Sequence, residues 1–501
     1  MTLSRPAPRA DPAAIDFGAP SAERDIERGL QEYFVESEAY GRVRSGAKRI
    51  VVGNRGIGKS AIFQVLARRE REEGSYVIEL SPEDYSYELL SQTMAAERSG
   101  SWAKLGAYAV AWKYLLYVLI MKEVSRRRVH LKKGEAAQIY KYVRDNHANA
   151  HGSTLSALVS YLKRMEGVKI GKYEASIRAR ELERLYKLEE IHHLLPGLRQ
   201  IAEQRRIVVL VDELDRGWDS SEDAQAFVAG LFQACLSVNS LHDNLRVYIS
   251  LRQELYDDIP ALYEDAQKYR DLIETIHWTE GSLLTLIANR IRHALPALAA
   301  RDDQECWSTL FGAPPGQPRA RSFGYMIERT LYRPREIIQF CTQVIECADG
   351  GQPGPPWPHR AITEAEAVYS ADRARDIAAE YRFQWPGLLS VIDAFRGQQA
   401  VIGRDDLELL CLALITRDIP SGGTGGWLDE CTPDQLIEIL WQVGLLRAEA
   451  EPPGGSTTSG SAGPGGRSFL GPHQARRLNL AAAQAFQVHP MFRAYLHAGG
   501  P

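Results

Sequence analysis

The stretch from Arg49 to Ser60 constrains the fold of this chain more than any other feature. It reads Arg-Ile-Val-Val-Gly-Asn-Arg-Gly-Ile-Gly-Lys-Ser and matches the pattern GxxxxGK[ST] at every fixed position. An apolar, β-branched run precedes the glycines, and a helix-like run, residues 61–67, follows them. A strand, a glycine-rich loop and a helix in this order predict a phosphate-binding P-loop.

Each part of this motif has a chemical task. The glycines let successive backbone N–H groups point at phosphate oxygens, and the helix N-terminus adds positive charge. We expect Lys59 to reach the β- and γ-phosphates and the Ser60 hydroxyl to hold Mg²⁺. The expected nucleotide-binding residues are Gly53, Asn54, Arg55, Gly56, Ile57, Gly58, Lys59, Ser60 and Ala61. The alternative, a glycine-rich turn that binds nothing, is disfavoured by the complete pattern and its flanks.

A second motif, residues 207–215, reads Ile-Val-Val-Leu-Val-Asp-Glu-Leu-Asp. Its five apolar residues are typical of a strand buried on both faces of a parallel sheet. Asp212 stands at the carboxyl end of this strand, where a carboxylate can hold Mg²⁺ through its water shell. Glu213 can polarise the water that attacks the γ-phosphate, which favours hydrolysis. The alternative is a strand that ends in ordinary solvated acids.

Composition sets the broad class. A chain of 501 residues has room for two or three domains, and 45% apolar with 25% charged residues is typical of a soluble globular protein. A net charge of −4 gives no global attraction to nucleic acid or to an anionic membrane. Six cysteines without a C-x-x-C pair or zinc spacing indicate reduced thiols, and therefore a cytoplasmic protein.

Two segments bear on membranes. Residues 1–20 are rich in Pro and Ala and lack the apolar core of a secretory signal. The run Leu105–Met121 is apolar but carries Lys113 at its middle, so we expect a buried helix of the domain and no membrane span.

Strands alternate with helical patterns in the first half of the chain, which predicts an α/β fold with a parallel sheet. The strands are expected at Ile50–Gly53, Tyr76–Leu80, Val208–Asp212, Arg246–Leu251 and Ile273–Trp278. A helix is expected at Ser21–Phe34, with Ser21 as its N-cap. The expected parts are a flexible tail (1–20), a P-loop core (21–279) with a helical insertion (about 97–203), a helical lid (280–349), a Pro/Gly linker (350–360) and a C-terminal domain (361–501).

The C-terminal domain reads as helices followed by a β-hairpin. Leu436–Trp441 has a helical pattern, Val443–Ala448 and Arg467–Leu470 look extended, and Phe486–Val488 is a candidate third strand. The intervening residues 451–466 are almost wholly Pro, Gly, Ser and Thr, which predicts a disordered hairpin tip. This order is the outline of a winged helix.

Together these motifs resemble the STAND and origin-recognition-like branch of the AAA+ P-loop ATPases. More closely, the chain is similar to a bacterial P-loop ATPase family associated with phage-defence and other conflict loci. The residues that carry the resemblance are Gly53–Ala61, the run Asp-Glu-Leu-Asp-Arg-Gly-Trp-Asp at Asp212–Asp219, Leu251-Arg252, Tyr332–Glu336 and Val488-His489-Pro490. It covers the chain from about Phe17 to the C-terminus.

The resemblance implies a parallel sheet ordered 5-1-4-3-2, a helical lid and a C-terminal winged helix. It also implies sensor residues: Ser250 or Arg252 after the fourth strand, and Arg333 or Arg335 from the lid. With Lys59 and Glu213, we therefore expect Arg252 and Arg335 in catalysis. An ordinary salt bridge is the alternative for each arginine.

The predicted function is an ATP- and Mg²⁺-dependent switch or remodelling subunit of a bacterial anti-phage defence system. Because no nuclease, protease or deaminase motif is present, a separate protein effector is the expected partner, in a homo- or hetero-oligomer. The alternative is a DNA-binding AAA+ initiator or loader, although Arg467, Arg476 and Arg477 are the only basic candidates near the hairpin. A P-loop kinase is a third possibility, which Glu213 disfavours.

Overall fold

The structure of the protein is a computed structural model, which forms two compact units, Glu36–His277 and Met1–Val35 with Trp278–Pro501. The residues that it describes are 15–19, 21–80, 101–126, 134–147, 188–214, 221–259, 262, 269–312, 321–348, 355–417, 423–424, 426–450, 468–475 and 478–497.

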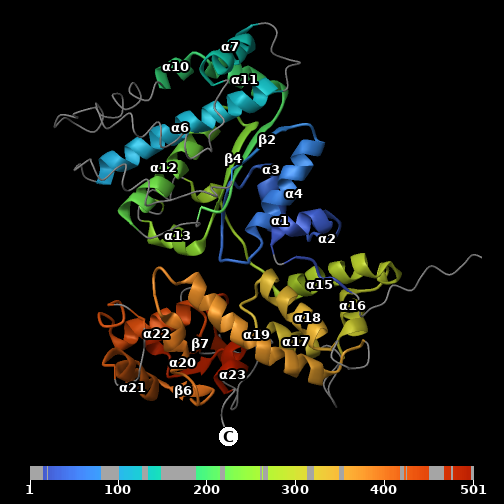
Figure 1. Ribbon diagram of the computed structural model, residues 1–501, viewed down its shortest axis with the longest axis vertical. Coiled ribbons are helices and arrows are strands. Elements are labelled where there is room, and N and C mark those ends of the chain that lie inside the picture. The colour runs from blue at the N-terminus through green and yellow to red at the C-terminus, as the bar shows by residue number, and fades with distance from the viewer. Residues whose placement is uncertain are drawn as a thin grey trace, which may run out of the picture. The chain divides into compact units, whose positions relative to one another are not determined.

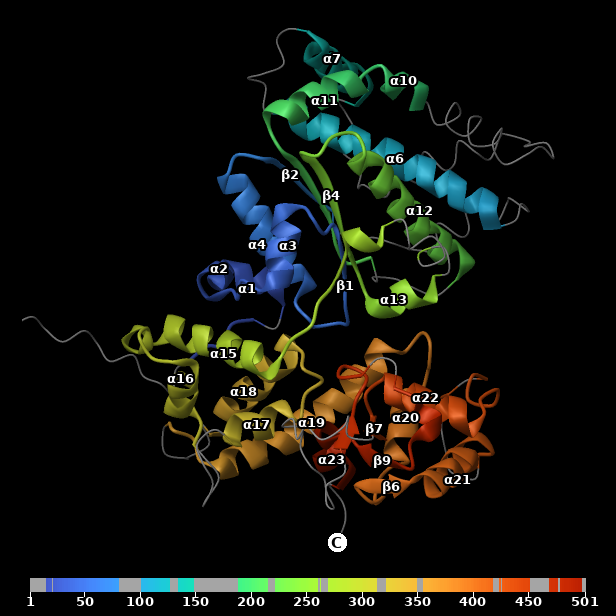
Figure 2. The same cartoon turned by 180° about the vertical axis from the view of Figure 1, so that it is seen from behind.

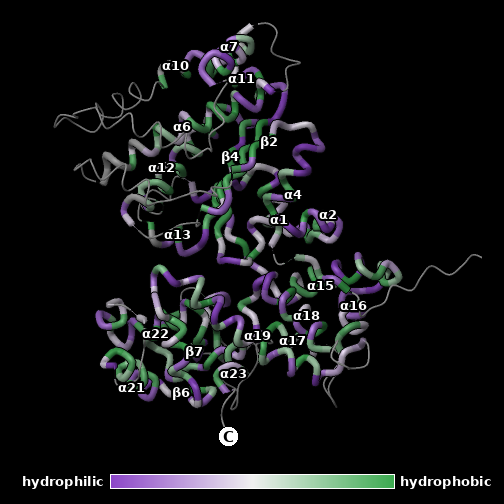
Figure 3. Tube along the Cα trace, in the orientation of Figure 1, coloured by the Kyte–Doolittle hydropathy of each residue, from purple (hydrophilic) through white to green (hydrophobic). Residues whose placement is uncertain are grey.

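The unit Glu36–His277 is built on a parallel sheet of five strands. These are β1 (Ile50–Val52), β2 (Tyr76–Leu80), β3 (Ile207–Val211), β4 (Leu245–Leu251) and β5 (Ile273–Thr275). Their order, β2-β3-β4-β1-β5, confirms the expected order 5-1-4-3-2 read from the opposite edge. All five residues of β3 are buried, as its apolar run predicts, and the strands are coloured hydrophobic in Figure 3. The last strand ends three residues earlier than expected, at Thr275.

Helices cover both faces of this sheet (Figures 1 and 2). On one side lie α3 (Glu38–Ser45) and α4 (Lys59–Glu72), and on the other α6 (Ser101–Arg126) and α12 (Glu222–Asn239). Because side chains of a strand alternate between faces, odd-numbered residues of β3 join the core with α6 and α12. Tyr248 of β4 points to the other face and packs edge-on against Phe63 of α4.

The expected helical insertion is visible in part. Its described helices are α6, α7 (Glu135–His147), α10 (Leu188–His192) and α11 (Leu195–Gln204). The apolar run with Lys113 lies in α6, where Trp112 and Leu116 are buried, so the expected buried helix is confirmed. A Cβ at Gly230 of α12 would lie 2.6 Å from the Tyr108 Cβ of α6, which shows how closely the two helices pack. Among the described helices, none is long and apolar enough to cross a membrane.

The other unit begins with short turns where a single helix was expected. Ser21–Phe34 forms α1 (Ala22–Asp25), which runs into a 3₁₀ turn (Ile26–Arg28), and α2 (Leu30–Tyr33), which Gly29 at φ +98° separates from that turn. Ser21 makes no side-chain capping bond. The buried Asp25 pairs with Arg290 at 2.9 Å, so this segment packs with the residues after 277, although the expected boundaries placed it in the P-loop core.

The rest of this unit is helical with a small antiparallel sheet. The helices are α15 (Glu280–Ala294), η7 (Pro296–Leu298), α16 (Asp303–Leu310), α17 (Arg321–Ile327), α18 (Pro334–Ala348), α19 (His359–Glu380), α20 (Leu388–Asp393), α21 (Arg404–Ile415), α22 (Pro433–Gln442) and α23 (Pro490–His497). The strands, ordered β6-β9-β7-β8, are β6 (Val401–Gly403), β7 (Leu446–Ala450), β8 (Ser468–Leu470) and β9 (Ala485–Val488). The hairpin and third strand expected in this region are therefore present, and the expected tip, 451–466, lies outside the described residues.

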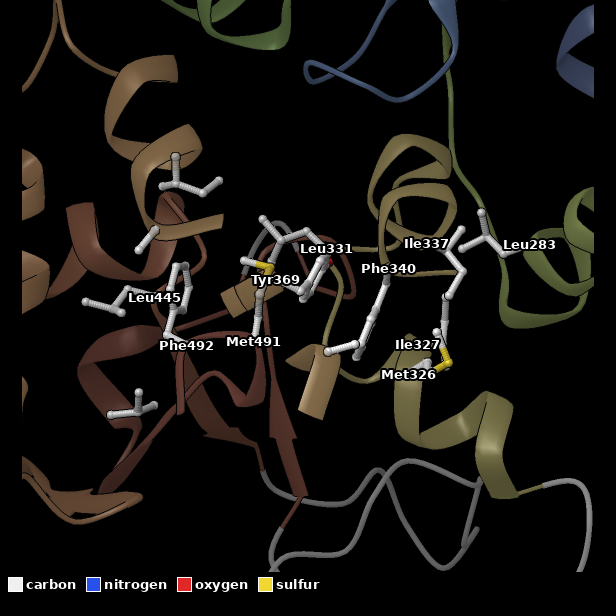
Figure 4. Packing of buried hydrophobic residues seen from close by; sticks show 14 of the residues in the cluster. Leu283, Met326, Ile327, Leu331, Ile337, Phe340, Tyr369, Leu445, Met491 and Phe492 are labelled. Carbon is white, nitrogen blue, oxygen red and sulfur yellow. The ribbon is translucent and has the colours of Figure 1, made fainter. Parts of the chain in front are cut away.

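One hydrophobic core runs through this unit. Phe340 of α18 and Tyr369 of α19 stack with their ring centres 4.3 Å apart, and Met491 and Phe492 of α23 belong to the same cluster (Figure 4). The helices expected as a lid and those expected as a separate C-terminal domain thus share their core. Only part of the expected Pro/Gly linker, from residue 355, is among the described residues.

Candidate nucleotide-binding site

The glycine-rich loop between β1 and α4 has the conformation that its sequence requires. Gly56 and Gly58 have φ angles of +77° and +104°, a region that L-residues rarely adopt. A Cβ at Gly53 would lie 2.9 Å from the Cγ2 atom of buried Ile57, so a larger residue there would force Ile57 to shift. The glycines of the pattern are therefore needed for the turn itself.

Lys59 and Ser60 open α4 directly after this loop. The Lys59 Nζ atom donates hydrogen bonds to the carbonyl oxygens of Gly53, at 2.6 Å, and Asn54, at 3.0 Å, so the ammonium group lies against the loop. The bond from the Ile62 N–H to the Gly58 carbonyl follows the first three N–H groups of the helix. Such N-terminal N–H groups bind anions. The loop, the lysine and the helix end together fit a nucleotide phosphate chain.

Asp212 stands at the same edge of the sheet as the P-loop. Val211 of β3 pairs with Ile249 of β4, and Ile249 pairs with Ile50 of β1. Since parallel strands end at one edge, Asp212 follows β3 at the edge where the P-loop follows β1. Continuing the alternation of β3 puts Asp212 on the α4 face of the sheet, and Ser60 lies in the first turn of α4. A hydroxyl and a carboxylate are suitable partners for hydrated Mg²⁺, the ion that neutralises phosphate charge when bound.

Glu213 adopts an unusual backbone conformation. Its φ angle is +60°, in the left-handed region that costs a non-glycine residue about 1 to 2 kcal/mol. Its N–H donates to the Oδ1 atom of Asp212 at 2.9 Å, and its side chain is half-buried. The turn breaks the strand alternation immediately after Asp212 and sets the direction of Glu213. The rest of the motif, residues 215–219, lies outside the described residues.

The two candidates for the first sensor position lie at the end of β4. Ser250 pairs with Val51 of β1, is 2% exposed, and its Oγ atom has no hydrogen-bond partner within the described part of the chain. Arg252 is half-buried and precedes α13 (Gln253–Asp258). A buried hydroxyl without a partner costs about 1 to 3 kcal/mol. This cost favours Ser250 over Arg252 as the residue that would bind a polar group at this edge of the sheet.

The two candidates for the second sensor position belong to the other unit and differ in their contacts. Arg333 is 4% exposed, and its Nη1 atom lies 2.9 Å from the Oε2 atom of Glu380. The Nε atom of Arg333 lies 3.7 Å from the Oε1 atom of Glu336, whose carboxyl pKa is raised by burial. The salt-bridge alternative therefore describes Arg333. Arg335, the second residue of α18, is half-buried, and its sensor role stays a prediction.

Sequence reasoning missed the ion pair that anchors the edge of the sheet beside the P-loop strand. Glu274 of β5 pairs in register with Val51, and its carboxylate accepts two hydrogen bonds of 2.8 Å from Arg42 of α3. The two residues are 232 positions apart in the chain, so no local pattern could have linked them.

Comparisons with known proteins add partial matches. Residues 281–378 match the model of a FunZ-associated C-terminal helical domain. An 80.3 kDa protein of Escherichia coli (strain K12), named for transposon gamma-delta, is 24% identical over 405 residues, which cover 76% of this chain and 53% of that protein. The chain thus spans about half the length of this curated relative.

Among solved structures, the ORC2 protein of Aeropyrum pernix is similar in two forms. The form described as ADPNP-ADP complexes aligns with a TM-score of 0.37 and 13% identity, over 94% of this chain and 91% of that one. The ADP form aligns with a TM-score of 0.31 and 12% identity, over 93% and 91%.

Proposed function

We propose that the chain binds ATP with Mg²⁺, hydrolyses it, and acts as a regulatory switch or remodelling subunit with a separate protein effector. The observation that carries this proposal is the placement of Asp212 and Glu213. They follow β3 at the edge of the sheet where Lys59 and Ser60 follow the P-loop, and Glu213 is turned out of the strand by its positive φ. A positioned carboxylate next to a metal-holding aspartate is the arrangement that water activation needs.

The experiment is phosphate release by the full chain with Mg²⁺ and ATP. We expect Glu213→Gln to slow hydrolysis at least about a hundredfold, the scale of losing a general base, while binding of a fluorescent ATP analogue persists. The matched control is Glu203→Gln, an exposed residue of α11 that precedes β3 at the opposite edge of the sheet. Hydrolysis at the parent rate after Glu213→Gln would contradict the assignment.

The biological setting is part of the same proposal. The resemblance to families at phage-defence loci supports a role in bacterial defence. The relative named for a transposon supports a role in the conflict between mobile genetic elements and their hosts. Deleting the gene from its host, and restoring it with Lys59→Ala, tests this role through the efficiency of phage plating. Equal plating efficiency on the parent strain, the deletion strain and the strain that carries Lys59→Ala would contradict this role.

The DNA-binding alternative is favoured by the helices and hairpin of the C-terminal segment and disfavoured by their charge. The helix before the hairpin, α22, exposes Asp434, Gln435, Glu438 and Gln442. Two carboxylates on this helix would repel phosphates, whereas duplex binding needs several cationic side chains on one face. The basic candidates Arg467, Arg476 and Arg477 lie outside the described residues.

A further inference from the structure

Helix α21 presents two leucines to solvent. Leu409 and Leu412 are 65% and 46% exposed, and they lie one turn apart on the same face. The opposite face of the helix, with Leu407, Cys411 and Leu414, is fully buried. Helix α21 lies at the outside of its unit in both views (Figures 1 and 2). The exposed leucines are thus not needed for the core beneath them.

The surroundings of these leucines are acidic. Residues 401–450 contain nine Asp or Glu residues and three arginines, a net charge of −6, whereas the whole chain has −4. The Arg404 guanidinium pairs with Glu408 and Asp434, the Arg417 guanidinium pairs with Asp429, and Arg447 is buried. The three arginines are therefore paired or buried, and the net charge around the leucines stays negative.

The exposed carboxylates flank the leucine pair. Asp405 and Asp406 lie in the first turn of α21, and Asp434 and Glu438 lie on the exposed face of α22, which packs against α21. We call these four residues with Leu409 and Leu412 the acidic leucine surface. Two copies of it would bring carboxylates together, and nucleic acid would meet like charge, so neither is its natural occupant.

We propose that the acidic leucine surface binds a basic amphipathic helix of a partner protein. Leucines one turn apart accept the apolar anchors of a helix, and the flanking carboxylates complement Lys or Arg beside those anchors. The inference rests on the proposed function, because it gives the chemistry of the effector segment that this subunit would contact.

The experiment uses the full chain and a fluorescent 18-residue helical peptide with Leu at every third or fourth position and Lys or Arg at the flanks. We expect micromolar binding by anisotropy, at least tenfold weaker for the same peptide with Glu flanks or with Ser replacing Leu. Leu409→Ser with Leu412→Ser should weaken binding at least tenfold. The control is Val368→Ser, because Val368 is as exposed as Leu412, at 46%, but lies on α19. An unchanged melting temperature shows that each variant folds.

Three outcomes would overturn the inference: no binding of the basic peptide at 100 µM, equal binding after Leu409→Ser with Leu412→Ser, or salt-steep binding of duplex DNA that the same substitutions abolish. The proposed function fails separately. If Glu213→Gln hydrolyses ATP at the parent rate, the catalytic assignment of Glu213 falls while peptide binding stands. If the peptide does not bind but Glu213→Gln stops hydrolysis, only the inference falls.

Discussion

The Oδ1 atom of Asp212 accepts a hydrogen bond of 2.9 Å from the N–H of its own neighbour, Glu213. This bond closes the turn in which Glu213 has a φ of +60°. One carboxylate of the pair thereby helps to orient the other, at the edge of the sheet where the P-loop also lies. Because the position of the Glu213 side chain depends on a strained backbone, we expect substitutions of Glu213 to change stability as well as activity.

Replacing Glu213 by glycine should remove this strain. We expect Glu213→Gly to raise the free energy of unfolding by up to about 1 kcal/mol, because glycine adopts the left-handed region without penalty. It should also reduce ATP hydrolysis as severely as Glu213→Gln. The control, Glu203→Gly in α11, should instead lower stability by about 0.5 to 1 kcal/mol. Urea denaturation of the full chain measures both, and destabilisation by both substitutions would contradict the strain argument.

The Lys59 ammonium group, which lies against the Gly53 and Asn54 carbonyl oxygens, is expected to move to the phosphates when nucleotide binds. Lys59→Ala should therefore abolish nucleotide binding or turnover. Lys141→Ala, an exposed lysine of α7 in the same unit, should leave both unchanged. Titration with a fluorescent ATP analogue checks this, and wild-type affinity and turnover in Lys59→Ala would rule out the P-loop assignment.

Arg333 and Arg335 should respond differently to truncation. Arg333→Ala leaves the buried Glu380 carboxylate without its partner, so we expect a loss of about 3 to 5 kcal/mol of stability. Arg335→Ala should cost less than 1 kcal/mol and slow ATP hydrolysis, if Arg335 is the sensor arginine. Melting temperatures and phosphate release separate the two. If Arg335→Ala is destabilised but each folded molecule still hydrolyses ATP at the parent rate, Arg335 does not belong to the site.

Nucleotide is expected to change assembly. A lid arginine such as Arg335 that contacts the γ-phosphate would couple ATP to domain position, a hinge-type change. Mass and hydrodynamic radius, measured with and without non-hydrolysable ATP, test this expectation. Identical values in both states would count against a nucleotide switch.

The buried His489 makes stability depend on pH. Burial, and next the charge of Arg447, hold its pKa well below the ordinary value of 6.5, so it is neutral in the folded chain and accepts a bond from the Met491 N–H. The unfolded chain then binds more protons below pH 6.5, and stability falls as the pH falls. We expect a loss of about 1 kcal/mol between pH 6.5 and pH 5.5. His489→Gln should reduce this slope in denaturation curves by the contribution of His489 alone, because burial also lowers the pKa of His473 to about 3. His497→Gln, at an exposed position, should leave the slope unchanged.

Local chemistry explains what the sequence alone determined. The P-loop spacing predicted a strand, a turn and a helix because its glycines are required by φ angles and close contacts within six residues. The apolar run before Asp212 predicted a strand buried on both faces, because five apolar residues in succession leave neither face of the strand polar. The hairpin β7–β8 and the third strand β9 also followed from short apolar patterns bounded by Gly, Pro and Ser.

Tertiary structure decided what depends on residues far apart in the chain. Only the fold pairs Arg42 with Glu274 beside the P-loop strand, buries Arg333 against Glu380, and draws Asp25 to Arg290. An isolated arginine has the same local sequence signature whether it meets a phosphate or a carboxylate. The packing of helices that are distant in the sequence decides which of the two it meets. A buried charge must be paired, and the fold determines which opposite charge lies beside it.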